Sequence, residues 1–392
     1  MSRVCDLSGI NMAEFEPEMR RYATEYHACS LESLPVEAAG VLGGEEASLS
    51  LSDPQVYSCG IYELEDGTAR EDRTRKGAVE FISTEGELKG SHAMSSGVLD
   101  LQWSRELVAC AMSTGELHVL KAAADYTLEP MAVSVAEEGT EETEGYFLSV
   151  DWGQDVNSDI AVSTQEGSLL VYRLSETCLE EMVHITGAHS MMGGNMPAWT
   201  TIFDPFSSNR RLVSGGDDMK MRLWDLRGPC ATASDAAATN SKTHTAGVTF
   251  LKWHPTREHC FASGSYDESV RLWDDRNVRT PVAEMAVGGG VWRIKWRLCD
   301  ADPSSALLAV AGMQHGSSIL RADFPIADVD SEMAEEASLS HIGAYDFGTG
   351  DKMLNYGIDF LNSSTDDNER KVTLVSSSFY DNLVDVWTWT AP

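Results

Sequence analysis

Short apolar runs rich in Val, Leu and Ile recur along the chain, and turns of Gly, Asp and Ser separate them. Two pairs of runs are near copies of each other: LVSGGDDMKMRLWDLR at 212–227 and FASGSYDESVRLWDDR at 261–276. Each copy predicts a strand, a tight turn and a second strand that ends in Trp-Asp. Trp224 and Trp273 are separated by little more than the roughly 40–45 residues of a four-stranded propeller blade. One such sheet cannot bury its faces alone, so the repeat predicts neighbouring blades.

The remaining runs follow the same order and predict an all-β, seven-bladed β-propeller built as a single domain. The predicted innermost strands lie at 25–34, 97–104, 146–153, 198–205, 288–296 and 354–361, and blade five occupies 247–276. Seven blades account for a chain of 392 residues. We expect the propeller to span 23–390. Residues 1–22 show no clear period and are a candidate for the strand that closes the last blade.

The repeat resembles that of WD-repeat propellers, in which a His, a Ser or Thr, a turn Asp and a Trp form a buried hydrogen-bonded set. The resemblance implies two complete sets: His189, Ser214, Asp218 and Trp224, and His244, Ser263, Asp267 and Trp273. The last blade keeps the same spacing in Ser377, Asp381 and Trp387. We interpret these residues as structural.

Composition narrows the class of partner. The formal net charge is −33, which disfavours nucleic acid and anionic membrane surfaces and favours a basic protein partner. The eight cysteines form no CxxC pair, so the spacing of a zinc site is missing. The first residues carry no apolar signal core, and no run of about 18 apolar residues predicts a membrane span. We therefore expect a cytoplasmic protein that acts without a metal or an organic cofactor.

Several stretches resemble one family beyond the generic repeat. The chain looks like the WD-repeat protein of diphthamide biosynthesis, the hydrolase that removes the methyl ester from methylated diphthine on translation elongation factor 2. The stretches that carry the resemblance are SKTHTAG (241–247), REHCFASGSYDESVRLWDDRN (257–277), GGGVWRIKW (288–296) and SSFYDNLVDVWTW (377–389). GGGVWRIKW is the most specific, because a generic blade carries Gly-His at that place. RLCD (297–300) departs from the family pattern, which more often has His-Pro after the Trp.

The resemblance implies ester hydrolysis, which needs a base, an activated water or nucleophile, and donors for the developing oxyanion. The sequence contains no GxSxG elbow. By their place near the central channel, the catalytic candidates are His189, His244, Arg293 and Asp359, and the substrate-binding candidates are Gly288, Gly289, Gly290, Trp292 and Tyr356. Both histidines also belong to the structural sets, Asp359 also suits a paired core carboxylate, and the glycines also suit a plain connector. The aromatic candidates suit the trimethylammonium group of diphthine.

A rival hypothesis is a non-catalytic scaffold. Two Trp-Asp-x-Arg endings, Trp224–Arg227 and Trp273–Arg276, resemble the box by which propeller receptors bind the adaptor of cullin-type ubiquitin ligases. The alternative for Arg227 and Arg276 is pairing with neighbouring carboxylates, which this acidic chain offers in number.

Overall fold

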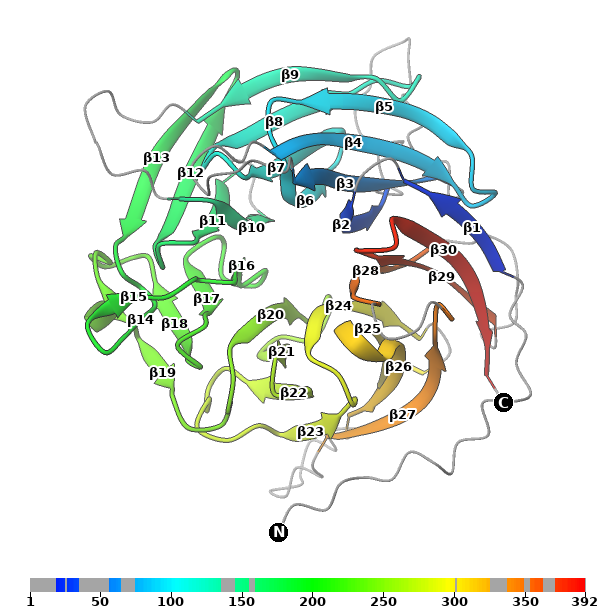
Figure 1. The fold of residues 1–392 in the computed structure, drawn as a ribbon. Coiled ribbons are helices and arrows are strands. Elements are labelled where there is room, and N and C mark those ends of the chain that lie inside the picture. The colour runs from blue at the N-terminus through cyan, green and yellow to red at the C-terminus, as the bar shows by residue number, and fades with distance from the viewer. Residues whose placement is uncertain are drawn as a thin grey trace.

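The computed structural model describes the chain in ten stretches: 19–24, 27–34, 56–64, 75–134, 145–154, 159–299, 302–324, 337–348, 353–361 and 371–391. Within them the chain forms seven antiparallel four-stranded sheets, arranged as blades around a central channel (Figure 1). The predicted seven-bladed β-propeller is confirmed. No helix in the described stretches is long and apolar enough to cross a membrane.

The first four blades follow one another along the chain, each from its innermost to its outermost strand. Blade one contains β2 (His27–Ser33), β3 (Val56–Leu64), β4 (Arg75–Ser83) and β5 (Leu88–Met94). Blade two contains β6 (Val98–Ser104), β7 (Leu107–Met112), β8 (Leu117–Ala122) and β9 (Leu128–Val133). Blade three contains β10 (Phe147–Trp152), β11 (Asp159–Thr164), β12 (Leu169–Ser175) and β13 (Cys178–Ile185). A hairpin of β14 (Ser190–Met191) and β15 (Gly194–Asn195) precedes blade four, which contains β16 (Thr200–Phe203), β17 (Arg211–Gly215), β18 (Met221–Asp225) and β19 (Ala238–Asn240).

The last three blades repeat the order. Blade five contains β20 (Val248–Trp253), β21 (Cys260–Ser265), β22 (Ser269–Asp274) and β23 (Ala283–Ala286). Blade six contains β24 (Val291–Leu298), β25 (Ser305–Gly312), β26 (Gly316–Asp323) and β27 (Ser338–Tyr345). Blade seven contains β28 (Asn355–Phe360), β29 (Lys371–Ser378) and β30 (Leu383–Thr390). Short 3-10 turns, η4 (Ala233–Asp235) and η5 (Met313–His315), lie in blades four and six.

Burial of both sheet faces explains why the middle strands are continuous apolar runs. Every residue of β25, SALLAVAG, is buried, and so is every residue of β21. The core consists of apolar clusters between adjacent blades, such as the one that joins Leu272 of β22 to Ile294 and Leu308 of blade six. Full burial of each such side chain stabilises the fold by roughly 1.5–3 kcal/mol.

The ring closes through the two ends of the described chain. Strand β1 (Met19–Ala23) pairs antiparallel with β30 and so supplies the outer strand of blade seven. Arg21 of β1 donates to both oxygens of the buried Asp385 at 2.7 Å, and Tyr345 Oη donates to the same carboxylate at 2.8 Å. The closure therefore joins the N-terminal strand, blade six and blade seven through one carboxylate. Residues 1–18 lie outside the described residues.

The hydrogen-bonded set of blade seven differs from the one predicted. Trp387 Nε1 donates to Ser376 Oγ at 2.9 Å, so Ser376 takes the place predicted for Ser377. Asp381 accepts a hydrogen bond from Ser378 Oγ. The cause is the hairpin: Ser263 faces Arg271 in blade five, whereas Ser376 faces Asp385, which makes the turn of blade seven one residue longer.

Candidate active site

A cavity of about 340 Å³ lies at the mouth of the channel, where the innermost strands begin. Every blade contributes to this channel-mouth cavity near the first residue of its innermost strand. Its lining consists of Cys29, Tyr62, Leu99, Asp100, Tyr146, Leu148, Ser149, Gln165, Pro197, Trp199, Thr249, Phe250, Tyr266, Trp292, Arg293 and Tyr356. It combines aromatic rings with one ion pair.

Bulges in the innermost strands turn side chains into this cavity. The pairing of the first two strands shifts register after the first or second residue in six blades. The residues skipped by these shifts are Cys29, Leu99, Leu148, Thr249, Trp292 and Tyr356, and all six line the cavity. A β-bulge inserts an unpaired residue and re-aims its side chain, and bulges are frequent beside active sites.

One wall of the cavity is aromatic. Trp292 stacks on Tyr356 with ring centroids 4.6 Å apart and an interplanar angle of 21°. Trp199 contacts Trp292 edge-on at 5.7 Å and Tyr266 at 6.0 Å, and Tyr266 lies 6.0 Å from Trp292. Asp217 fixes the Trp199 indole by accepting its Nε1–H at 3.1 Å. The structure thus brings the two predicted aromatic residues together and adds two more.

A buried ion pair forms the polar part of the lining. Arg293 Nη1 donates to Asp100 Oδ1 at 2.9 Å, and the two side chains are each only 5% exposed. Val150 N donates to the other carboxylate oxygen at 3.0 Å. Although burial lowers the pKa of Arg293, attraction to Asp100 and Glu32 raises it above its usual value. Arg293 Nε has no hydrogen-bond partner in the described part of the chain, so part of the guanidinium is uncommitted.

Asp359 lies outside the lining of this cavity. Its Oδ2 accepts hydrogen bonds from Ser33 N at 2.8 Å and Ser33 Oγ at 3.1 Å, and lies 3.7 Å from Lys295 Nζ. Lys295 also donates to Glu32. Burial raises the pKa of Glu32, which the charge of Lys295 offsets only in part. These three residues form a second buried charged cluster in the channel.

A second, smaller cavity of about 180 Å³ lies at the opposite ends of the innermost strands of blades three to five. Asp151 and Lys252, whose Oδ1 and Nζ are 3.9 Å apart, belong to its lining. Burial raises the pKa of Asp151 to about 6.

The predicted catalytic histidines lie inside the blades, and neither lines the channel-mouth cavity. His189 Nδ1 pairs with Asp218 Oδ1 and its Nε2 with Ser214 Oγ, both at 2.8 Å. His244 Nε2 pairs with Ser263 Oγ at 3.0 Å. Burial lowers the pKa of both, that of His244 to about 4.

The serine of each set also receives the indole of its blade. Trp224 donates to Ser214 at 2.9 Å and Trp273 donates to Ser263 at 2.8 Å. Asp218 and Asp267 accept hydrogen bonds from the arginine four positions on and from backbone amides after the histidine, at Ser190 and Thr245. These contacts tie the turn, the second strand and the third strand of each blade together.

The three predicted glycines pack against η5 beside the cavity and do not line it. Gly288 has φ +85°, and a Cβ there would lie 3.0 Å from the His315 ring. Gly290 accepts a hydrogen bond from Met313 N at 2.9 Å, and a Cβ on it would lie 3.3 Å from Tyr266. The positive φ of Gly288 favours glycine, and a Cβ at Gly288 or Gly290 would crowd His315 or Tyr266.

Sequence reasoning missed Asp100, Trp199 and Tyr266. Asp100 follows the bulge of β6 as Arg293 follows the bulge of β24. Aligning GVLDLQWS with GGGVWRIKW would have placed the two side chains at the same depth of the channel. Tyr266 directly precedes the predicted turn residue Asp267, and Trp199 directly precedes β16. Both positions recur in every blade, so a comparison of the blades at these positions could have found the two residues.

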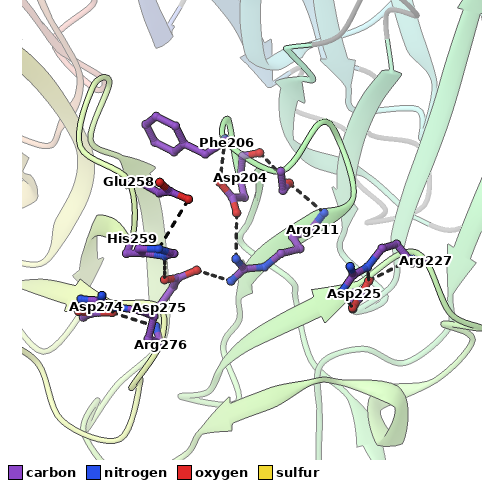
Figure 2. Close-up of polar contacts among 11 residues, drawn as sticks. Asp204, Phe206, Arg211, Asp225, Arg227, Glu258, His259, Asp274, Asp275 and Arg276 are labelled. Atoms are coloured by element: carbon purple, nitrogen blue, oxygen red, sulfur yellow. Dashed lines mark hydrogen bonds and ion pairs between the residues drawn. The ribbon is translucent and has the colours of Figure 1, made fainter.

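The Trp-Asp-x-Arg endings lie in blades four and five, in a polar surface cluster (Figure 2). Arg227 Nε donates to Asp225 and Arg276 Nε donates to Asp274, both at 2.8 Å, while the arginine side chains stay 64% and 68% exposed. Each arginine thus pairs with the carboxylate of its own motif. In the same cluster Arg211 links Asp204 of its own blade to Asp275 of blade five (Figure 2).

No group of three or more His, Cys, Asp and Glu side chains within the described stretches is arranged to hold a metal ion.

Comparison with known proteins places the chain in a class. The profile of the family described as "WD domain, G-beta repeat" matches residues 199–225 and 238–274. A chain of a crystal structure of the mitotic checkpoint complex aligns with a TM-score of 0.60 over 95% of this chain and 91% of its own length. At 12% identity that likeness concerns the fold alone. Together with the hydrogen-bonded sets, these matches define a WD-repeat β-propeller protein.

Within that class, the chain is similar to a set of curated relatives. The relative from Dictyostelium discoideum, named "Diphthine methyltransferase homolog", is 25% identical over 85% of this chain and 92% of its own length. The relatives from Mus musculus and Homo sapiens, named "Diphthine methyltransferase", are 33% and 32% identical over 58% and 52% of this chain. The alignment spans about half of their length, 47% and 45%. These relatives confirm the predicted resemblance to the WD-repeat family of diphthamide biosynthesis.

Proposed function

We propose that this protein hydrolyses the methyl ester of methylated diphthine on translation elongation factor 2. The observation that carries the proposal is the channel-mouth cavity, which gathers Arg293, Trp292 and Tyr356 into one lining. Arg293 and Trp292 lie in GGGVWRIKW, one of the stretches by which the sequence resembles the family. The proposal includes elongation factor 2 as partner and the cytoplasm as location.

The relatives' names refer to methyl transfer, and our proposal is removal of the methyl group. Transfer from a donor requires a site that holds donor and acceptor together. The cavity, at about 340 Å³, stands at the small end of the roughly 300–1,000 Å³ of ligand pockets. Hydrolysis requires room for one side chain and a water, because water is the acceptor.

The ion pair and the aromatic wall suit the two ends of such a substrate. A guanidinium placed at the ester carbonyl stabilises the negative charge that develops when water adds, and burial strengthens that interaction. The electron-rich faces of Trp292 and Tyr356, extended by Trp199 and Tyr266, attract a quaternary ammonium group. The side chain of diphthine methyl ester carries both groups.

The proposal assigns the chemistry to residues of the cavity. His189 and His244 are engaged inside their blades, and Asp359 is engaged by Ser33 and Lys295, so their catalytic roles stay predictions without support from position. Arg293 is the one catalytic candidate from the sequence that lines the cavity.

The test is incubation of the full chain with elongation factor 2 that carries methylated diphthine, followed by mass spectrometry of the modified peptide. We expect loss of one methyl group and release of methanol. Substrate that gains a methyl group would support transfer. An unchanged substrate, with a folded protein, would favour the scaffold hypothesis and a test of adaptor binding by wild type and Arg276→Ala.

A further inference from the structure

We propose that Asp100 is the general base that activates water in the channel-mouth cavity, an inference that rests on the proposed hydrolysis. Asp100 is the only carboxylate in the cavity lining, and that lining contains no histidine among the described residues. The other carboxylates of the channel are committed elsewhere. Glu32 and Asp359 pair with Lys295, and Asp151 belongs to the cavity at the opposite end.

The bonds of Asp100 orient it and leave it capacity for a water. Oδ1 accepts from Arg293 Nη1 and Oδ2 accepts from Val150 N. An ionised carboxylate has about four acceptor positions, so about two remain. The residue is 3% exposed and directly follows the bulged Leu99, which fixes the backbone at the cavity wall. A base held by two hydrogen bonds in a largely water-excluded site needs little reorganisation when the reaction occurs.

The titratable and charged groups around Asp100 come from three strands. Arg293 of β24 faces it directly, and Cys110 of β7 and Asp151 of β10 interact with it electrostatically. The guanidinium is 2.9 Å from the carboxylate and its plane is covered by Phe250, whose ring centroid is 5.1 Å from Cζ. The base and the oxyanion donor are therefore held side by side.

The reaction balances with these two groups and water. Asp100 takes a proton from water as the oxygen adds to the ester carbonyl, and Arg293 stabilises the resulting oxyanion. The tetrahedral intermediate collapses, the bond to the methoxy oxygen breaks, and Asp100 returns the proton to give methanol. The carboxylic acid product then ionises in water.

The test compares Asp100→Asn and Asp100→Glu with Asp204→Asn in single-turnover hydrolysis across pH, with thermal unfolding as the check on folding. General-base catalysis contributes about 10²–10⁴-fold, so Asp100→Asn should lower the rate by that factor and remove the decline of rate at acid pH. Asp100→Glu keeps a carboxylate and should retain part of the rate together with the acid decline. Asp204→Asn removes a buried carboxylate that lines neither cavity, so this variant should match wild type.

Two results would overturn the inference. One is folded Asp100→Asn protein whose rate stays within about threefold of wild type, since base catalysis contributes about 10²-fold or more. The other is a wild-type rate that does not decline at acid pH. This second result does not depend on whether any variant folds. Absence of hydrolysis by wild type would instead contradict the proposed function itself.

Discussion

At the residue scale, single serine hydroxyls hold the blades together. Ser263 Oγ accepts the indole N–H of Trp273 and contacts His244, and Ser214 does the same for Trp224 and His189. All these side chains are buried, so a lost partner leaves a polar atom without water to replace it. An unsatisfied buried group of this kind costs about 1–3 kcal/mol.

We therefore expect His244→Ala to lower the free energy of unfolding by about 1–3 kcal/mol, because Ser263 loses one of its two hydrogen-bond partners and a buried space opens. Urea denaturation checks the change. Once folded, the variant should bind cavity ligands as wild type does, since His244 does not line the cavity. Full stability with abolished hydrolysis would contradict this and restore His244 as a catalytic candidate.

The free energy of unfolding of the protein should fall as pH drops from about 6.5 toward about 4. Burial lowers the pKa of His254 to about 4, whereas an unfolded histidine has a pKa of about 6.5. Between these values the unfolded state binds a proton that the folded state does not, so acid favours unfolding. His254 Nδ1 accepts from Thr256 N and Arg257 N, a role that an Asn oxygen can imitate. Urea unfolding of His254→Asn over this range should show a smaller decline; an equal decline would exclude His254 as a contributor.

Single residues were predictable where a motif fixed their place. GGGVWRIKW predicted Arg293 and Trp292 because its glycines and aromatics stand out from a generic blade. Asp100 could not be predicted in the same way, since GVLDLQWS has the pattern of an ordinary inner strand. The role of the Asp100 carboxylate becomes visible only when the fold places Arg293 beside it. Ser377 was misplaced because spacing alone does not reveal a turn that is one residue longer.

At the scale of strands, the predicted order of inner, second and third strands is present in every blade. The outermost strands were harder to predict from the apolar pattern, because one face of each meets solvent. The residues of β5 and β13 are mostly exposed or half-buried. The bulges could not be predicted, because innermost strands such as β20 and β28 are buried on both faces and lack the alternation that an inserted residue would interrupt. Those bulges nonetheless decide which side chains line the cavity.

The aromatic wall formed by these strands should bind choline and discriminate it from its neutral isostere, in which carbon replaces nitrogen. The two have the same shape, so the difference isolates attraction of the cation to the ring faces, about 0.5–2 kcal/mol. Isothermal titration calorimetry measures both. Trp292→Ala should abolish the discrimination, and Trp253→Ala, outside this cavity, should retain it. Equal affinity of wild type for the two compounds would refute a cation site.

At the scale of the molecule, the fold was predictable from the repeat, because a blade demands neighbours and the length allows seven. Residues 1–22 were a candidate for the closing strand, but the pairing of Met19–Ala23 with β30 and of Arg21 with Asp385 follows no apolar period that would fix its bounds. The net charge of −33 is a property of the whole chain and acts at distances beyond any one contact.

The net charge should therefore affect the binding of the protein substrate and have little effect on the binding of small ligands. Raising the salt concentration from about 0.05 to 0.5 M shortens the screening length to a few ångströms, which weakens steering of a basic partner. We expect the rate of association with elongation factor 2 to fall while choline affinity changes little. Stopped-flow binding and calorimetry provide the two measurements. A salt-independent association rate would exclude steering by net charge.

The most direct test of the whole account is single-turnover hydrolysis of methylated diphthine on elongation factor 2 in water labelled with heavy oxygen. Addition of water to the ester carbonyl predicts one labelled oxygen in the product carboxylate and unlabelled methanol. Label in the methanol would mean attack at the methyl group. Loss of the methyl group without label in either product would mean transfer to another acceptor, and both results would contradict addition of water to the ester carbonyl in the channel-mouth cavity.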